Sequence, residues 1–387
     1  MMSGKSPRVA ILVETSSFYG RGLLHGILSY VRKRGPWTIY IAEQSPVNAP
    51  EWLRNWKGDG IIARVETPQI YEAVMKTGAR VIDLSATRSQ RDIPYVGTDD
   101  TATAKLAAKH LLERGFKHFG YCGDERYNWS YWRAVPFTQT IADAGYRCST
   151  FQGGAPHGPT TVATWEEEKE LTTWLQGLPR PAGVLACNDF RGWQLLEICR
   201  RIGRTVPDEL AIIGVDNDEL LCELSTPPLT SIELDTFRSG YEGARMLDQW
   251  MSGTRPTKLL RVKPLRVVTR QSTDVLTVPD SDISEAIRFI RDHACEGINV
   301  EDILKAIPLS RRVLEHRFKK LLGRTPHDEI LRVQFQHVVE FLTETDLSLY
   351  EVAERSGFRY PEYLSTAFKR RFGMPPKKYR EMNTRSH

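Results

Sequence analysis

A dense group of basic side chains lies near the C-terminus of the 387-residue sequence. Residues 283–387 contain 19 Lys and Arg against 15 Asp and Glu, whereas residues 1–282 contain 34 against 33. Positive charge gathered in this way is typical of proteins that bind a polyanion such as DNA, although solvated basic faces are also common. The densest stretch includes no acidic residue and consists of Lys369, Arg370, Arg371, Lys377, Lys378 and Arg380.

Two aspartates form a second group of candidate functional residues. Asp189 and Asp216 each follow a short apolar run that has the length of a β-strand. Open parallel sheets bind their ligands at the carboxyl ends of the strands, so both side chains are candidate ligand contacts. An aspartate that follows a strand also often caps the next helix. Metal binding and helix capping both remain open for the Asp-Asn-Asp-Glu cluster at 216–219.

Short apolar runs alternate with amphipathic stretches through the first 275 residues. The segment 103–114 has a helical pattern, with His110 and Leu111 among the residues on one face and Gly115 as the stop. Strands separated by helices in this way predict βαβ units and parallel sheets, and hence an α/β domain over residues 1–275. The runs predicted as strands are Val9–Val13, Thr38–Ala42, Gly60–Ala63, Arg80–Leu84, His118–Cys122, Gly183–Ala186 and Ala211–Val215.

The sequence pattern changes near residue 280. Residues 276–284 have the composition of a linker, in which Pro279 interrupts the preceding structure and Asp280 or Ser281 can cap a following helix. Beyond this segment, apolar residues recur at helical spacing as far as residue 382. We therefore predict a second, all-α domain over residues 285–387.

The predicted all-α domain contains an internal repeat with an offset of 50 residues. The pattern Leu314-x-x-x-Phe318-Lys319 recurs from Leu364, and Gly323-x-x-Pro326 recurs from Gly373. Each copy follows a short helical stretch, at 300–306 and 349–356, and a tight turn. A short helix, a turn and a second, basic helix are typical of helix-turn-helix DNA binding, which predicts two such units at about 300–321 and 349–372. A helical repeat for protein binding is the alternative, and a copy number of two disfavours it.

The second unit matches a family signature at many fixed spacings. The matching residues are Leu349, Val352, Ala353, Gly357, Phe358, Tyr363, Leu364, Phe368, Lys369, Phe372, Gly373, Pro376, Tyr379 and Arg380. In these residues the chain resembles the AraC/XylS family of transcription regulators. The first unit departs from that pattern at Leu304, where a small Ala is usual, and at Pro308, where the turn usually has Gly. The resemblance implies recognition helices at about 310–321 and 361–372.

The resemblance also implies roles for the side chains of these two helices. Arginine can pair with guanine and glutamate can accept from cytosine, so direct base contacts are expected from Arg312, Glu315 and His316. Phosphate contacts are expected from Arg311, Arg317, Lys319 and Lys320, while Val313, Leu314, Phe318 and Leu321 are expected to face the core. On the second helix the groove-facing set is Pro361, Glu362, Ser365 and Thr366, supported by Lys369, Arg370 and DNA shape.

The first 270 residues carry a second resemblance. The stretches Val96–Asp100, Ala107–Gly115, Asn188–Asp189 and Ile213–Asn217 resemble the sugar-binding domain of LacI/GalR regulators and periplasmic binding proteins. LacI members carry a DNA-binding headpiece before the first strand; here that strand begins near residue 8, so we expect the C-terminal domain to replace it. The stretches Asp59–Ala63, Trp174–Pro179, Arg270–Asp274 and Arg291–Gly297 resemble the xylose-operon activators. The combination implies a D-xylose-sensing activator of pentose catabolic genes.

A sugar ligand calls for a particular set of side chains. Its hydroxyls donate and accept hydrogen bonds and its ring has apolar C–H faces, so carboxylates, an arginine and aromatic rings match it. Asp189 and Asp216 are the expected carboxylates, and the family's Arg-x-x-x-Phe segment implies Arg133. The residues expected to stack on the ring are Phe18 and Trp132, with Tyr19 and Trp129 as further candidates. Asp99 and Asp100 are expected to be hinge or cap residues.

Other function classes find little support in the sequence. The six cysteines include no C-x-x-C pair, which argues against a disulfide framework and a zinc site and suits a reducing cytosol. Phosphate-loop glycines, histidines at metal-ligand spacing and a Gly-x-Ser-x-Gly elbow are all missing from the sequence. No signal-peptide core or apolar run of ~18 residues occurs either. We therefore expect a cytoplasmic protein that is not an enzyme and has no cofactor, metal or membrane partner.

Three functions remain open at this point. The first is a sugar-responsive regulator whose partners are double-stranded operator DNA and a monosaccharide, D-xylose or another, acting as activator or repressor. The second is a sugar-binding module whose basic C-terminal segment is incidental, which a DNA-binding assay distinguishes from the first. The third is a sugar-processing enzyme, which a turnover assay tests. A homodimer is expected by family analogy.

Overall fold

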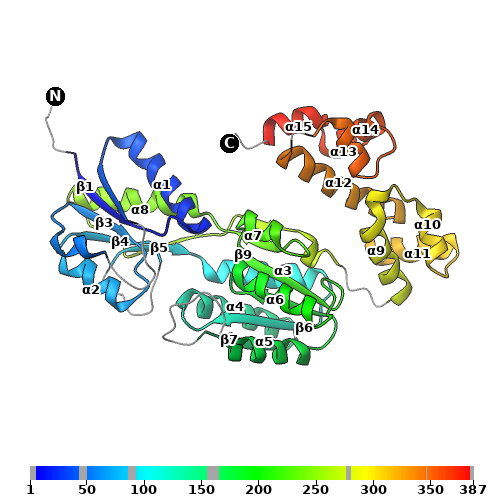
Figure 1. Cartoon of the computed structure of the whole chain (residues 1–387), viewed down its shortest axis with the longest axis horizontal. Helices are drawn as coiled ribbons and strands as arrows, with labels where there is room; N and C mark the ends of the chain where they lie inside the picture. Colours follow the sequence, from blue (N-terminus) through cyan, green and yellow to red (C-terminus); the bar gives the residue numbers. More distant parts are fainter. Residues whose placement is uncertain are drawn as a thin grey trace. The chain divides into compact units, whose positions relative to one another are not determined.

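The computed structural model describes residues 6–42, 50–85, 93–154, 165–275, 280–345 and 347–383. It divides into two compact units, residues 1–275 and 276–387 (Figure 1). The first unit is an α/β unit with two sheets, and the second is all-helical. This is the predicted fold class. No helix among the described residues combines the length and apolar character needed to cross a membrane.

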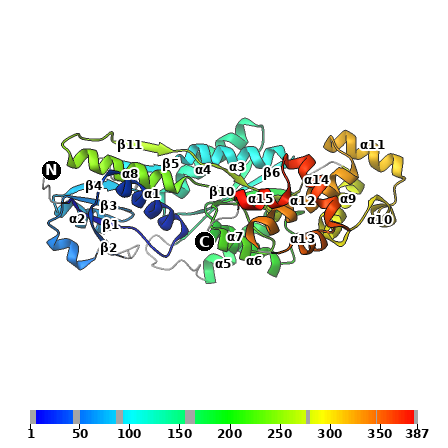
Figure 2. The ribbon, with the colours of Figure 1, turned by 90° about the horizontal axis from the view of Figure 1, so that it is seen from above.

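The first sheet of the α/β unit is parallel, with strand order β11-β5-β4-β3-β1-β2. The helices that pack on it include α1, α2 and α8, and α1 and α8 lie side by side (Figure 2). The bounds are β1 Arg8–Leu12, α1 Phe18–Arg34, β2 Thr38–Ala42, η1 Glu51–Asn55, β3 Gly60–Ala63, α2 Pro68–Lys76, β4 Arg80–Asp83, β5 Tyr95–Thr98, α8 Thr236–Met251 and β11 Leu259–Val262.

The second sheet has the order β12-β10-β9-β8-β6-β7 and is parallel except for β12, which runs antiparallel to β10. Buried side chains of α3, α4, α5 and α6 form its cores. The bounds are α3 Asp100–Glu113, β6 His118–Asp124, α4 Asn128–Asp143, β7 Cys148–Gly153, α5 Trp165–Gly177, β8 Ala182–Ala186, α6 Asp189–Arg201, β9 Leu210–Asp216, α7 Glu219–Leu224, β10 Thr230–Glu233, β12 Arg266–Val268 and η2 Gln271–Thr273.

The chain passes from one sheet to the other between β5 and α3, between β10 and α8, and between β11 and β12. Both sheets therefore belong to one unit although each has its own hydrophobic core. All seven predicted strands are present with closely similar bounds. The carboxyl ends of these strands are where the side chains described below converge.

The helical unit has two cores joined by one helix. The first core includes Leu314 and Phe318, and the second includes Leu364 and Phe368, the residues that repeat in the sequence. Helix α12 contributes Ile330 to the first core and several residues to the second. The bounds are α9 Ser281–His293, η3 Ala294–Glu296, α10 Val300–Ala306, α11 Arg311–Leu322, α12 Pro326–Glu344, α13 Leu349–Arg355, α14 Pro361–Phe372 and α15 Pro376–Asn383.

Two expectations about this unit need correction. Residues 281–284 belong to helix α9 rather than to a linker, because the Asp280 side chain accepts a hydrogen bond from the Ile283 amide and caps the helix. Residues 276–279, with Pro279, lie outside the described residues. Val313 does not face the core; it is 36% exposed, since it lies about 100° around α11 from the buried Leu314.

Candidate functional site

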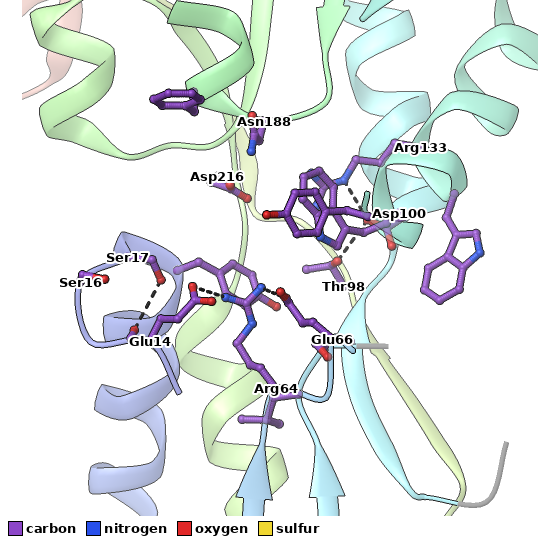
Figure 3. Close-up of a pocket in the computed structure, with 18 residues that line it drawn as sticks. Glu14, Ser16, Ser17, Arg64, Glu66, Thr98, Asp100, Arg133, Asn188 and Asp216 are labelled. Atoms are coloured by element: carbon purple, nitrogen blue, oxygen red, sulfur yellow. Dashed lines mark hydrogen bonds and ion pairs between the residues drawn. The ribbon is translucent and has the colours of Figure 1, made fainter. Parts of the chain in front are cut away.

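A cavity of about 550 Å³ lies where the carboxyl ends of the two sheets face each other in the α/β unit (Figure 3). Its size is that of a small-molecule site. Side chains that follow strands β1, β3, β8 and β9 line it, together with residues of β5, α1, α3 and α4. The charged and amide side chains among them are Glu14, Arg64, Glu66, Asp100, Arg133, Asn188 and Asp216.

On the side of the first sheet, one arginine lies between two glutamates. A terminal nitrogen of Arg64 is 3.1 Å from Oε2 of Glu14, and the other terminal nitrogen donates to Glu66. Burial opposes the charge of Arg64, but the two carboxylates outweigh it and raise the pKa of the guanidinium. Burial raises the pKa of Glu66, against the opposing effect of Arg64. The trio presents fixed donors and acceptors to the cavity.

Opposite this trio, Arg133 of α4 is almost completely buried. Its Nε donates to Oδ1 of Asp100 at 2.8 Å, and a terminal nitrogen donates to the carbonyl oxygen of Cys187 at 2.5 Å. Asp100 also accepts a 3.2 Å bond from the hydroxyl of Thr98. A buried arginine held by a carboxylate and a carbonyl is fixed in position before any ligand arrives.

Asp216, the last residue of β9, differs from the other carboxylates of the cavity. Among the described residues, none donates a hydrogen bond to its side chain. Burial raises its pKa to about 6, while Arg133 and Arg64 act in the opposite direction. Its backbone has a φ of 113°, which is unusual for a residue other than glycine. A partly buried carboxylate in this state is equipped to accept hydrogen bonds from a polar ligand.

Aromatic rings form much of the remaining wall. Tyr127 and Trp129 are stacked with their ring centroids 4.9 Å apart and an interplanar angle of 17°. The guanidinium of Arg133 lies 4.9 Å from the ring centroid of Trp129, which fixes that ring against a buried cation. The aromatic lining residues are Tyr19, Tyr127, Trp129, Trp132 and Phe190. Flat apolar rings beside polar groups suit a ligand with both C–H faces and hydroxyls.

Two of the predicted ligand contacts do not line the cavity. Phe18 is the first residue of α1, and its neighbour Tyr19, about 100° further around the helix, faces the cavity instead. Asp189 is 2% exposed and uses its carboxylate within the protein, accepting from the hydroxyl of Ser231 and the amide of Asp218. The predictions for Phe18 and Asp189 therefore need correction, whereas Trp132, Arg133 and Asp216 all lie at the cavity.

In the helical unit, α11 has an exposed basic face. Arg312, His316, Lys319 and Lys320 are exposed, as the prediction of DNA contacts requires. Arg311 is paired with Glu301 at 2.6 Å and with Glu315 at 3.0 Å; exposed pairs of this kind contribute little to stability. Arg311 can therefore exchange these two carboxylates for a polyanionic partner.

Arg317 differs from its neighbours on α11. It is half-buried and lies 3.2 Å from Asp280 and 3.1 Å from Asp282, at the start of α9. A phosphate contact by Arg317 thus competes with two carboxylates.

On α14 the predicted groove-facing residues are accessible to different extents. Glu362, Thr366, Lys369 and Arg370 are exposed, while Pro361 and Ser365 are half-buried. The Thr366 hydroxyl donates to the carbonyl oxygen of Glu362 at 2.9 Å. This bond within the helix uses the single hydroxyl hydrogen of Thr366.

Family models match three successive parts of the chain. They are an XylR N-terminal domain at residues 8–101, a periplasmic binding protein-like domain at 108–273 and a helix-turn-helix domain at 303–382. The xylose operon regulatory protein of Escherichia coli (strain K12) is 30% identical over 393 residues, 99% of each chain. That of Haemophilus influenzae is 30% identical over 382 residues, 96% of this chain and 98% of the relative.

The chain belongs to the family of xylose operon regulatory proteins. This regulator is also similar to a solved structure of the xylose-binding transcription activator xylR, with a TM-score of 0.78, 30% identity, and coverage of 99% of this chain and 100% of the other. A regulator CelR–cellobiose complex, at 20% identity and a TM-score of 0.57, covers 68% of this chain and 84% of the other, and it shares the fold of the α/β unit.

Several cavity residues of the regulator escaped sequence reasoning. Glu14, Arg64 and Glu66 follow strands β1 and β3 just as Asp216 ends β9, so their position after a predicted strand was the available signal. Asp99 caps α3 by accepting from the Ala102 amide, as expected. Asp100 was expected to play a similar part, but it is buried, lines the cavity and pairs with Arg133.

Proposed function

We propose that this regulator binds D-xylose in the cavity of the α/β unit and activates transcription in response. The observation that carries the proposal is the Asp216 carboxylate, which accepts no hydrogen bond from the described residues and faces two prearranged arginine–carboxylate groups and a wall of aromatic rings. A pentose in its ring form offers hydroxyl hydrogens to the carboxylates, hydroxyl oxygens to the arginines and C–H faces to the rings. Family membership adds D-xylose as the first candidate.

Each polar group then has a distinct role in the bound state. Asp216 accepts one or two hydroxyl hydrogens, which satisfies a carboxylate that burial disfavours. Arg64 and Arg133 donate from positions already fixed by Glu14, Glu66 and Asp100, so little conformational entropy is lost on binding. The rings of Trp132, Tyr19 and Trp129 cover the C–H faces.

The output of the regulator is DNA binding by α11 and α14. Arg312, Glu315 and His316 contact base edges, and Lys319 and Lys320 contact phosphates. Pro361, Glu362, Ser365 and Thr366 lie in the next major groove. We infer that the active species is a cytoplasmic homodimer without catalytic activity, since its relatives are regulators rather than enzymes.

A thermal-shift experiment on the full-length protein tests the ligand. D-Xylose, L-arabinose, D-ribose and D-glucose are compared at matched concentrations, and D-xylose is expected to give the largest rise in melting temperature. At ~100 times its dissociation constant a ligand adds about 2.7 kcal/mol of apparent stability. If no pentose or hexose at millimolar concentration shifts the melting temperature, the sugar proposal is wrong. Recovery of the sugar chemically unchanged after incubation checks that no turnover occurs.

A further inference from the structure

The turn that begins with the last residue of β9 lies between the cavity and the C-terminal residues of the α/β unit. Its first two residues, Asp216 and Asn217, have φ values of 113° and 52°, both in the left-handed region. Residues other than glycine rarely adopt this region, and Asn and Asp tolerate it better than most. A turn held in this conformation needs support from its neighbours.

The first support comes from beneath the turn. The buried carboxylate of Asp189 accepts from the amide of Asp218 at 2.8 Å and from the hydroxyl of Ser231 at 2.5 Å. The same Ser231 oxygen accepts from the amide of Asn217 at 3.0 Å. Asp189 is therefore a positioning residue, which holds the turn so that Asp216 reaches the cavity.

The second support comes from Arg270, whose side chain is only 9% exposed. A terminal nitrogen of Arg270 donates to Oδ1 of Asn217 at 2.9 Å and to the carbonyl oxygen of Leu229 at 3.1 Å, while Nε pairs with Glu223 of α7. Asn217 is thus bonded to Arg270 on one side and is adjacent in sequence to Asp216 on the other.

Arg270 immediately precedes η2, the last short helix before the unit ends at Val275. The hydroxyl of Ser272 donates to the carbonyl oxygen of Ile212 at 2.6 Å and accepts from the amide of Thr230 at 2.8 Å. This segment is therefore fastened to β9, which leads into the turn, and to the neighbouring strand β10. Arg270 and Ser272, which make these contacts, both lie in the stretch 270–274, one of those that resemble the xylose-operon activators.

We propose that the Asn217–Arg270 hydrogen bond transmits sugar binding from Asp216 to the segment that leads into the DNA-binding unit. The inference rests on the proposed function. When sugar hydroxyls bond to Asp216, the left-handed turn rotates to accommodate them, and the side chain of Asn217 moves with it. The guanidinium of Arg270 follows, so that η2 changes position. Asn217 therefore determines how operator affinity responds to sugar and does not determine the affinity for sugar itself.

Substitutions at Asn217 can separate these two roles. Asn217→Gly removes the oxygen that Arg270 contacts but keeps a residue for which a φ of 52° is unstrained. Asn217→Asp restores the acceptor and tolerates the same φ. Glu223→Gln removes the charge of another partner of Arg270 on α7 and leaves the Asn217 contact in place, so it is the matched comparison.

The test uses the full-length protein and two measurements on each variant. Calorimetry gives the dissociation constant for D-xylose, and fluorescence anisotropy gives operator affinity with and without D-xylose at fixed salt. Asn217→Gly is expected to bind D-xylose within about threefold of the unaltered protein while its operator affinity no longer changes with sugar, and couplings of this kind are typically about 5- to 150-fold. Asn217→Asp and Glu223→Gln are expected to retain the response.

The outcomes distinguish this inference from the proposed function. If the unaltered protein neither binds D-xylose nor responds to it, the proposed function fails. If it responds and Asn217→Gly responds equally, the transmission through Asn217 is wrong. Loss of D-xylose binding by Asn217→Gly, or failure of Asn217→Asp to restore the response, would also overturn the inference, because Asn217 would then only shape the cavity.

Discussion

At the scale of single residues, the chemistry of the cavity depends on which carboxylates are already paired. Glu14, Glu66 and Asp100 each bond to an arginine, whereas Asp216 gains no hydrogen bond from the described residues. A bound sugar therefore improves the environment of Asp216 more than that of the other three.

The first prediction concerns Asp216→Asn. The substitution keeps the size of the side chain but removes the charge and one acceptor, and hydrogen bonds to charged groups contribute about 1.5–3 kcal/mol. We expect the affinity for D-xylose to fall by roughly 10- to 150-fold. Isothermal calorimetry measures it. The unliganded melting temperature should stay the same or rise, since a partly buried charge is removed.

Asp99→Asn is the matched control for that variant. Asp99 lies one residue from Asp100 but serves as the N-cap of α3, a position where Asn performs as well as Asp. D-Xylose affinity should be unchanged in this variant. An equal loss in both variants would show that charge in this region, and not the Asp216 contact, is what matters.

The second prediction is a pH dependence of sugar affinity. With the pKa of Asp216 at about 6, the ionised carboxylate that accepts hydroxyl hydrogens is depleted as the pH falls below that value. If the sugar binds only this form, affinity falls by about tenfold for each pH unit below 6 and is constant above it. Calorimetry from pH 5 to 8 measures the profile. The step should be missing in Asp216→Asn; the same step there would assign it to another group.

Sequence reasoning at this scale used a motif for Arg133, the place after a strand for Asp216 and aromatic character for Trp132. Asp216, Arg133 and Trp132 were predicted and lie at the cavity. Asp189 was predicted for the same reason as Asp216, its place after a strand, but a strand end does not specify the direction of the side chain. The Arg64 trio went unnoticed because no motif links residues that meet only in the fold.

At the scale of elements, the helices that the family resemblance implied at about 310–321 and 361–372 lie close to the bounds of α11 and α14. Strands β5, β7, β10, β11 and β12 were not among those predicted. Three of them carry exposed residues, so they lack the continuous apolar run of a central strand. An edge strand forms by pairing with its neighbouring strand, and this pairing is not visible in the sequence pattern.

The third prediction compares Arg312→Ala with Lys319→Ala, both on the exposed face of α11. Loss of a base contact by Arg312 should cost ~1–3 kcal/mol and relax the preference at one operator position. Loss of a phosphate contact by Lys319 should weaken binding to all sequences alike and reduce the salt slope by about one. Anisotropy titrations with an operator panel at several salt concentrations separate the two. Identical slopes and preferences in both variants would refute this division.

At the scale of the whole molecule, sensing and DNA binding lie in separate compact units, each with its own cores. Coupling between two sites is reciprocal, so any factor by which sugar changes DNA affinity is also the factor by which DNA changes sugar affinity. The chain between the units, 276–279, lies outside the described residues.

The fourth prediction concerns residues 280–387 expressed alone. Since they include both helical cores and the Asp280 cap of α9, they should fold and bind a single half-site. Their affinity should be weaker than that of the full-length protein and independent of D-xylose. Operator affinity and footprint length, with and without sugar at fixed salt, are the measurements. A sugar response in the fragment, or none in the full-length protein, would contradict the scheme.

Helix α12 sets a length that the operator must match. The helix has 19 residues, contributes side chains to both helical cores and spans about 28 Å, close to the ~34 Å between successive major grooves on one face of DNA. Roughly five base pairs inserted between the two contacted grooves turn the second groove away, and roughly ten restore its direction but double the separation. A flexible tether would recover binding at ten, whereas a continuous helix cannot extend. The number of residues in α12 therefore determines the spacing that is permitted between the two contacted grooves of each half-site.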